Sequence, residues 1–232
     1  MGFNVQTAVD AKHHLIVAHE VTNIGRDRDQ LASMAKGTRT AMGTQEFTVV
    51  AHRGYFKSEE ILACHEAGIT AIVPKSHTSE AKAEGCFDKS VFIYTAAANE
   101  YRCPAVQRLI WRFATIEGGL KLHCYWSSHC QGRSIKSRCT PSHARRVKRW
   151  EHASVLEAMQ TRLDHAPEMM RIRRQTVEHP FGTIKSWMGA THFLTKTLDR
   201  VRTEMSLHVL AYNMKRVIRL LGTTALMDAM RA

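Results

Sequence analysis

One histidine occupies a position where enzymes often carry out chemistry. The segment VVAHRGYFKSEEI, residues 49 to 61, predicts a buried strand that ends near His52 and a helix that begins at Ser58. In α/β proteins, functional side chains concentrate at the carboxyl ends of strands. An imidazole there can act as a general base, can bind Zn2+, Cu2+ or Ni2+, or can be a hydrogen-bonded histidine at a strand end. The sequence identifies no nucleophile that a general base would serve.

A second candidate site lies in the segment RQTVEHPFGTIK, residues 174 to 185. Glu178 follows Arg174 by four positions and precedes Lys185 by seven, and both spacings return near the same side of a helix. Cations on such a face can bind phosphates. The alternative interpretation is an ordinary solvated basic face.

The most basic stretch of the chain runs from Gln131 to Trp150 and contains seven Lys or Arg residues and no acidic residue. Four of these cations lie near its end: Arg145, Arg146, Lys148 and Arg149. Such a run can be a solvated segment, but its combination with Trp150 favours contact with DNA phosphates. Phosphate contacts position a protein on DNA and do not specify a sequence.

The composition of the whole chain also favours a polyanionic partner. The 232 residues include 33 Lys or Arg and 21 Asp or Glu, which gives a formal net charge of +12 at pH 7. The N-terminus lacks the pattern of a signal peptide, and no apolar run approaches the roughly 20 residues that span a bilayer. We therefore expect a cytoplasmic protein without a membrane partner, in which the six Cys residues are thiols or metal ligands.

The elements that must position these residues follow from the periodicity of the sequence. The runs FNVQTAVD and LIVAHEVT predict an antiparallel hairpin. The elements predicted after the hairpin are a helix at 27–42, a strand at 47–51, a helix at 58–67 and a strand at 70–74. This order predicts a mixed α/β sheet.

The chain divides into three parts by pattern. Residues 1–75 form the α/β core, residues 76–150 form a Cys-rich basic insertion in which periodicity fades, and residues 151–232 are helical. The last helix carries one apolar stripe, for which we predict ordinary packing against a core: Leu207, Leu210, Ala211, Met214, Val217, Ile218 and Leu221.

Three segments, taken in order, carry a resemblance to a known family. Residues 174 to 185 fit Arg-x3-Glu-x6-Lys, and residues 49 to 61 look like a (V/A)-x-A-D-R/K-G-Y segment with His52 in the Asp position. The opening GFNVQTAVDAKHHLIVAHEVTNIGRDRDQL is similar to the segment that precedes that Asp in the same proteins. The chain thus resembles, over nearly its whole length, the DDE transposases of bacterial insertion sequences, in the branch with a Tyr-x2-Arg-x3-Glu-x6-Lys signature.

The resemblance implies an RNase H-like fold in which a mixed sheet presents three carboxylates to two Mg2+ or Mn2+ ions. Such a site activates the attacking oxygen and stabilises the leaving oxygen of a phosphodiester, and these hard cations need oxygen ligands. Glu178 corresponds to the catalytic Glu and hence to a Mg2+ ligand. Arg174 and Lys185 correspond to cations that hold DNA phosphates near the metal ions.

The sequence also departs from the family. Arg171 stands where the signature has Tyr, and His52 stands at the second catalytic Asp, although imidazole carries no negative charge and Mg2+ prefers carboxylate and water. The first Asp of the family lies on a strand upstream of the opening segment, and no residue here matches it. Asp10 is the alternative, but we expect it to be a turn residue. We therefore expect an RNase H-like sheet without its first strand, with a gap between the hairpin and the strand at 47–51.

The cysteines resemble a Cys-Pro and Cys-x2-Cys-x5-Cys cluster found in the insertion of related transposases. Cys103, Cys130 and Cys139 match it, whereas an Arg stands at the middle Cys of the cluster. Three thiolates would serve a tetrahedral Zn2+ site that needs four ligands, and His129 or Cys124 could complete it. The alternative is free thiols that pack as small hydrophobic groups.

From these observations we predict the C-terminal part of an insertion-sequence transposase, truncated and catalytically inactive as it stands. The alternative is a non-catalytic remnant that binds DNA or a transposase and modulates transposition. The expected partners are DNA, namely element ends and target, and either a second copy of the chain or a full-length transposase. Metal-dependent nicking of element-end DNA would favour an enzyme, and binding without cleavage would favour the remnant.

Overall fold

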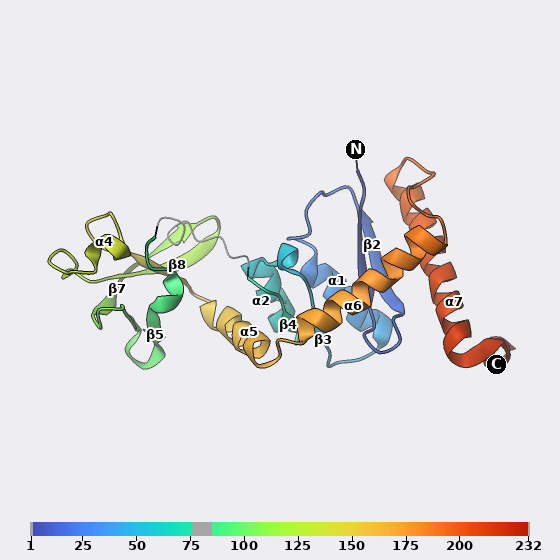
Figure 1. Ribbon diagram of the computed structural model, residues 1–232, viewed down its shortest axis with the longest axis horizontal. Helices are drawn as coiled ribbons and strands as arrows, with labels where there is room; N and C mark the ends of the chain where they lie inside the picture. Colours follow the sequence, from blue (N-terminus) through green and yellow to red (C-terminus); the bar gives the residue numbers. More distant parts are fainter. Residues whose placement is uncertain (1, 76–84, 232) are drawn as a thin grey trace. The chain divides into compact units, whose positions relative to one another are not determined.

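The chain forms two compact units and combines strands with helices (Figure 1). The computed structural model describes residues 2–75 and 85–231. Unit 1 comprises residues 1–76 and 155–232, and unit 2 comprises residues 77–154. The combination of strands and helices confirms the α/β class expected from the sequence.

Unit 1 alternates strands and helices, and its long C-terminal part is helical. Its first elements are β1 (Asn4–Val9), β2 (Ile16–Thr22), α1 (Leu31–Met42), β3 (Thr48–Val50), the 3-10 turn η1 (Arg53–Tyr55), α2 (Ser58–Glu66) and β4 (Thr70–Ile72). The later elements are α5 (Ala153–His165), which begins at the end of unit 2, α6 (Met169–Gly182), the π-helical turn η4 (Thr183–Trp187) and α7 (Leu198–Arg231).

The strands of unit 1 form two pairs instead of one continuous mixed sheet. β1 and β2 form the expected antiparallel hairpin, and β3 and β4 pair in parallel. The Asp10 carboxylate at the hairpin turn accepts hydrogen bonds from the backbone amides of Lys12 (3.1 Å) and His13 (2.8 Å). These bonds are typical of an Asp that stabilises a turn.

Helix α1 begins at Leu31, four residues later than the sequence predicts, because the acidic residues before it are bound elsewhere. The Asp29 carboxylate pairs with Arg26 (2.9 Å) and with Lys57 (2.7 Å). The first turn of α1 is instead stabilised by α2, since Glu60 Oε2 accepts a hydrogen bond from Ala32 N at 2.9 Å. A carboxylate at a helix N-terminus also interacts favourably with the helix dipole.

Two apolar clusters hold unit 1 together. One cluster joins α1, α2, β4 and α5, and its most buried members include Leu31, Ile61, Cys64, Val73 and Met159. The other cluster joins the hairpin to α7 and consists of Ile16, Val21, Ile184, Val201, Met205, Val209 and Tyr212. Helices α5 and α7 each bury one apolar face in these clusters.

Helix α7 also completes the outer edge of β2. The side-chain amide of Asn213 accepts a hydrogen bond from Ile16 N (2.9 Å) and donates one to Ile16 O (2.8 Å). Arg202 Nε donates to Val21 O (3.1 Å), and Tyr212 Oη donates to His14 O (2.7 Å). These side chains satisfy backbone groups that an edge strand otherwise leaves unpaired.

The apolar stripe predicted for the last helix does not pack against a core. Leu207 and Leu221 are 62% and 65% exposed, and Leu210, Met214 and Ile218 are exposed as well. The buried face of α7 carries Val201, Met205, Val209 and Tyr212 instead, as described above. The prediction was wrong because a helix with apolar residues on two sides can bury only the side that meets the hairpin.

Helix α6 ends in an irregular turn. Pro180 lies inside it and has no N–H with which to continue the helical ladder. The chain then forms the π-helical turn η4, in which Met188 N donates to Thr183 O at 3.0 Å. Residues after Gly182 therefore no longer follow the angular spacing of an α-helix.

Unit 2 is built on a five-stranded antiparallel sheet. Its strands, in spatial order, are β5 (Ile93–Thr95), β6 (Glu100–Arg102), β7 (Arg108–Glu117), β8 (Leu120–Trp126) and β9 (Val147–Trp150). The 3-10 turns η2 (Lys89–Val91) and η3 (Ala96–Ala98) and the short helix α4 (Lys136–Cys139) lie between strands. One face of the sheet is covered by a core of Phe92, Tyr101, Leu109, Tyr125, Cys139 and Val147.

The core of unit 1 can be tested at Met159, which is 1% exposed and packs in the first apolar cluster. Met159→Ala should lower the free energy of unfolding by about 2–5 kcal/mol, because it removes buried apolar atoms and leaves a cavity. The measurement is urea unfolding followed by circular dichroism. Met227→Ala, at an exposed position of α7, should change stability by less than about 0.5 kcal/mol; equal effects of the two variants would contradict the packing described.

Candidate functional site

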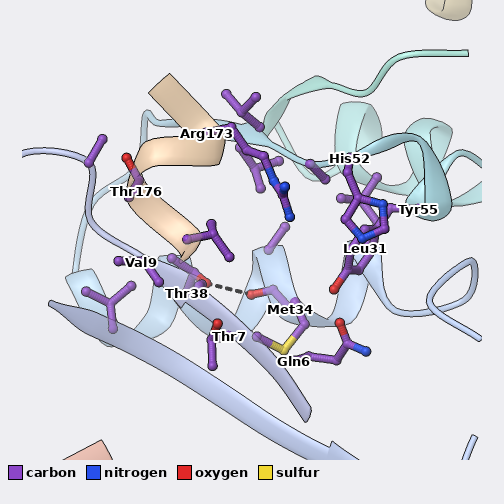
Figure 2. A pocket seen from close by; sticks show the side chains of 18 of the residues that line it. Gln6, Thr7, Val9, Leu31, Met34, Thr38, His52, Tyr55, Arg173 and Thr176 are labelled. Atoms are coloured by element: carbon purple, nitrogen blue, oxygen red, sulfur yellow. Dashed lines mark hydrogen bonds between the residues drawn. The ribbon is translucent and has the colours of Figure 1, made fainter. Parts of the chain in front are cut away.

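A cavity of about 440 Å3 separates the two strand pairs of unit 1. β1 lines one side and residues 47–52, which include β3, line the other. Helix α1 contributes Leu31, Met34, Ala35, Thr38 and Met42, and helix α6 contributes Ile172, Arg173, Thr176, Val177 and Phe181. Figure 2 shows labelled side chains of β1, α1 and α6 around this space, with the Arg173 side chain extending towards His52.

His52 lies at the rim of this cavity in a defined orientation. Gly54 N donates a hydrogen bond to His52 Nδ1 at 2.8 Å, so the proton of the neutral ring lies on Nε2. Nε2 faces Asp27 Oδ2 at 3.4 Å. A Cβ atom at position 54 would collide with the imidazole, so Gly54 is required for the ring to lie against the backbone.

Asp27 is the partner of His52 that sequence reasoning missed. Its Oδ1 accepts hydrogen bonds from Asn4 Nδ2 (2.8 Å) and from Gln6 Nε2 (2.9 Å), and its Oδ2 faces His52. Asn4 and Gln6 are two residues apart on β1 and therefore point to the same face of the strand. This pair of polar side chains on one face of a strand was the available sequence signal for a hydrogen-bonded partner.

The electrostatics of this cluster keep Asp27 charged and His52 neutral. Burial opposes ionisation of Asp27, but the hydrogen bonds from Asn4 and Gln6 and the nearby His52 outweigh it and lower the Asp27 pKa. Burial lowers the His52 pKa, and the charge of Arg173 lowers it further, whereas Asp27 opposes the shift. Tyr55, whose ring centroid lies 4.9 Å from that of His52, has a raised pKa because of burial and because of Asp27.

Arg173 brings a positive charge into the cavity. Its side chain extends from α6 towards His52 and Tyr55 (Figure 2). Among the described residues, no carboxylate lies within ion-pair distance of its guanidinium, although the charge acts on His52 and Tyr55. The cavity is thus apolar over most of its wall and cationic at one end.

Glu178, Arg174 and Lys185 do not join His52 in this cavity. All three are exposed, and the residues that α6 directs to the cavity are others, among them Arg173 and Thr176. Lys185 lies on the π-helical turn, and its Nζ is 6.0 Å from the centroid of the Phe181 ring. The face that the spacing predicts for the three residues assumes an unbroken α-helix, which ends at Gly182.

The donor set around the cavity does not fit a two-magnesium site. Among the described residues, Asp27 is the carboxylate paired with His52, and both of its oxygens already have protein partners. Within residues 2–75 and 85–231, no group of three or more His, Cys, Asp and Glu side chains is arranged to hold a metal ion. Two Mg2+ ions each require several oxygen ligands, and a neutral imidazole adds neither charge nor oxygen.

In unit 2, the four cations singled out from the basic stretch have different surroundings. Arg149 is 8% exposed and its guanidinium lies 3.8 Å from the centroid of the Tyr94 ring. Arg145 is half-buried and donates to Phe87 O at 3.2 Å. Lys148 is exposed, but both oxygens of Glu117 accept from its Nζ at 2.6 Å. Arg146 is exposed and stacks on an aromatic ring, as described next.

Two arginines, Arg146 from the basic stretch and Arg112 from β7, lie beside Trp126 on β8, together with an aromatic ring. The guanidinium carbons of Arg112 and Arg146 lie 5.3 Å and 5.4 Å from the centroid of its ring. The Phe113 ring meets the Trp126 ring edge-on, with centroids 5.8 Å apart. A bulge in β7 between Trp111 and Phe113 places Arg112 at this point. We call Arg112, Phe113, Trp126 and Arg146 the Trp126 surface.

The cysteines of unit 2 include one that the sequence pattern did not link to the others. Cys139 is buried in the core of unit 2, and Cys103 packs against the same core. Phe87 N donates a hydrogen bond to Arg138 O at 2.7 Å. Because Cys86 precedes Phe87 and Cys139 follows Arg138, this bond brings Cys86 near Cys139. Burial raises the Cys139 pKa, and the thiols of Cys130, Cys103 and Cys86 add to the shift. Four thiols therefore share one neighbourhood without forming a finished metal site among the described residues.

One further feature concerns membranes. Among the described residues, no helix combines the length and the apolar character that crossing a bilayer requires.

The charge pattern around His52 can be tested by an NMR titration of its imidazole. The His52 pKa should lie below the ordinary value of about 6.5. Asp27→Asn should lower it further, because the carboxylate favours the imidazolium, whereas Arg173→Gln should raise it. Arg174→Gln, which removes an exposed neighbouring charge, should leave it nearly unchanged; a pKa of His52 above 6.5 would refute the arrangement.

Comparison with known proteins identifies the family. The family model described as Transposase DDE domain matches residues 1–214. No curated protein and no solved structure matches the chain significantly. The match spans both units and most of the chain, as the resemblance of the three sequence segments predicted, and the chain belongs to the family of transposases with a DDE domain.

Proposed function

We propose that the chain acts in transposition by binding DNA, with its cationic and aromatic side chains, and that the site at His52 does not support metal-dependent cleavage as it stands. The family supports a role in DNA transposition. The assignment to bacterial insertion sequences, and to the branch with the Tyr-x2-Arg-x3-Glu-x6-Lys signature, is part of this proposal and depends on Arg174, Glu178 and Lys185.

The main support for the proposed DNA binding is the Trp126 surface. Arginine side chains bind phosphates through several directed N–H groups, and aromatic rings stack on bases. Arg112 and Arg146 flank an aromatic pair at distances that allow both contacts in one small area. Arg149 and Arg145 are bound within the unit and support the fold of this surface more than they support direct contact.

The exposed cations of α6 offer a second contact area in unit 1. Arg174 and Lys185 are exposed, as is Arg171, which replaces the Tyr of the signature. Their proposed partners are phosphates of the same DNA. We expect the binding to tolerate many DNA sequences, because its contacts are to phosphates, which every DNA sequence carries.

The proposal on cleavage depends on the ligands described for the cavity. The family chemistry requires a cage of carboxylates around two cations. His52 occupies the position of one carboxylate, and Glu178 is exposed on α6 away from the cavity lining. The alternative proposal from the sequence, a protein that modulates transposition by binding DNA or a transposase, is therefore favoured over an active recombinase.

DNA binding should be salt-dependent and localised to the Trp126 surface. The logarithm of the association constant for duplex DNA should fall with the logarithm of salt concentration by about 0.9 per neutralised phosphate. Arg146→Gln should reduce this slope by about one contact, measured by fluorescence anisotropy over a salt series. The matched control is Arg102→Gln. Arg102 is an exposed cation on β6 of the same sheet and lies outside the Trp126 surface. Equal slopes for both variants would remove the Trp126 surface from the interface.

Cleavage should be absent and should not be restored by one substitution. The unmodified chain and His52→Asp should both leave labelled element-end DNA intact in Mg2+ or Mn2+, because one added carboxylate does not supply the remaining ligands. The assay is strand nicking on a denaturing gel. Metal-dependent nicking by the unmodified chain that Glu178→Gln abolishes would show an active site and overturn this part of the proposal.

We also propose a zinc ion as a cofactor of unit 2, held by Cys103, Cys130 and Cys139 with Cys86 as the fourth thiolate. Four thiolates match the tetrahedral preference of Zn2+, although these side chains would have to reorient to form the site. Protein purified without chelator should contain about one zinc per chain by mass spectrometry. Cys86→Ser should reduce the content, whereas Cys64→Ser in unit 1 should not; protein free of zinc would refute this.

A further inference from the structure

The segment that joins α6 to α7, at one end of unit 1 in Figure 1, displays two large apolar side chains to solvent. Trp187 is 81% exposed and Leu194 is 82% exposed, and no other large hydrophobic side chain among the described residues is exposed to this degree. Single exposed apolar residues are ordinary on protein surfaces. The meaning of these two therefore depends on how the segment holds them and on what surrounds them.

Contacts with the body of unit 1 anchor the segment. Ala190 N donates a hydrogen bond to Ile184 O at 3.1 Å, which closes the turn after η4. The ring of Phe193 meets the ring of Phe3 edge-on, with centroids 6.2 Å apart. Phe193 also packs against the apolar cluster that joins the hairpin to α7. The residue that follows, Leu194, is thus carried by a backbone fixed to the core.

One carboxylate holds the backbone at Leu194 itself. Glu204, on α7, accepts hydrogen bonds from Leu194 N (2.8 Å), Thr195 N (3.0 Å) and Thr195 Oγ1 (2.7 Å). Hydrogen bonds to a charged acceptor are stronger than bonds between neutral groups. The protein therefore fixes the main chain at the point where it leaves a leucine side chain uncovered, which is the arrangement that a ligand contact requires and a free loop lacks.

The charges around the segment restrict the chemistry of its partner. Residues 179–198 contain two lysines, Lys185 and Lys196, and no Asp or Glu. Both lysines are exposed. Lys215 of α7 adds a third cation, with its Nζ 5.8 Å from the centroid of the Trp187 ring. Apolar side chains between cations complement duplex DNA, because phosphates border each groove and a base-pair step can accept an inserted apolar side chain.

We propose that the segment between α6 and α7 binds the minor groove of duplex DNA and inserts Leu194 between two neighbouring base pairs. The lysines bind phosphates beside the groove, and the ring of Trp187 lies against the sugars. Insertion unstacks one step, so it is most favourable at pyrimidine–purine steps such as TA, which deform easily. The inference rests on the proposed DNA binding and adds to it a preference for deformable steps, which phosphate contacts alone do not provide.

The probe is a GC-rich duplex with one central TA step, in which 2-aminopurine replaces the adenine of that step. The fluorescence of 2-aminopurine rises when the base loses a stacking neighbour. The full chain at saturation should raise this fluorescence. The rise should be much smaller in a second duplex that carries the same reporter within a run of adenines, because such a run is stiff. Equal rises in the two duplexes would contradict the preference for deformable steps.

A matched pair of variants tests the wedge. Leu194→Ala should remove most of the rise at the TA step, because an alanine side chain is too short to separate two base pairs. It should leave the salt dependence of binding in fluorescence anisotropy unchanged, because the lysines remain. Leu207→Ala is the control, since Leu207 is 62% exposed on α7 outside the segment, and it should keep the full rise. Equal rises in the two variants would overturn the assignment of Leu194.

Glu204 is a positioning residue in this proposal, and its substitutions test that role. Glu204→Gln keeps one acceptor for the backbone at Leu194, and Glu204→Ala keeps none. The rise at the TA step should therefore be largest in the unmodified chain, smaller in Glu204→Gln and smallest in Glu204→Ala. The salt dependence of binding should be nearly the same in all three, because a loosened segment still carries its lysines. A full rise with Glu204→Ala would refute the positioning role.

The remaining outcomes separate this inference from the proposed function. Salt-dependent binding of the TA duplex without a rise in fluorescence would refute the insertion of Leu194 and leave the proposed DNA binding intact. Failure to bind either duplex would refute both. Binding to phosphatidylglycerol vesicles that Leu194→Ala abolishes, without a rise at the TA step, would assign the segment to an anionic lipid surface and overturn the inference.

Discussion

The structure of unit 1 depends on how its strand edges satisfy their backbone hydrogen bonds. A buried N–H or C=O group without a partner costs free energy comparable to a lost hydrogen bond, and two-stranded ribbons have as many outer edges as inner ones. At the outer edge of β2, helix α7 supplies the partners: Asn213, Arg202 and Tyr212 form hydrogen bonds with backbone groups of the hairpin. The same helix thereby fixes the hairpin against the apolar cluster around Val201 and Met205.

The cavity of unit 1 lies between the other two strand edges, those of β1 and β3. Helices α1 and α6 both contact β1, and α6 also contacts β3, so the two strand pairs are held apart by helices that lie on either side of the gap. The apolar residues that these helices direct inward, such as Met34 and Val177, line the cavity together with the guanidinium of Arg173.

Much of unit 1 could be predicted because its signals are local. The hairpin runs alternate, the strand before His52 is a short β-branched run, and Ser58 begins α2 as its sequence indicates. Asp27 was assigned to the start of a helix because the apolar periodicity of residues 31–38 was extended back to it. Its true partners, Asn4 and Gln6, lie more than twenty residues away, and local patterns carry no information about such contacts.

The strands of unit 2 escaped prediction for a different reason. β7 has exposed apolar residues on its outer face, among them Ile110 and Phe113, so the alternation that marks a half-buried strand is lost. The bulge at Arg112 then shifts the side-chain period by one residue. The charge of the basic stretch was visible in the sequence, but its distribution was not, since Arg149 stacks on Tyr94 inside the unit and Arg146 stacks on Trp126 at the surface.

The partners of His52 and Asp27 explain why this corner of unit 1 holds a defined arrangement. With His52, the Nε2 proton faces the Asp27 carboxylate, Gly54 fixes the ring, and Asn4 and Gln6 bind the other carboxylate oxygen. The protein supplies these partners itself, so the charge of Asp27 is stabilised by its own hydrogen bonds and the ring of His52 is held in one orientation.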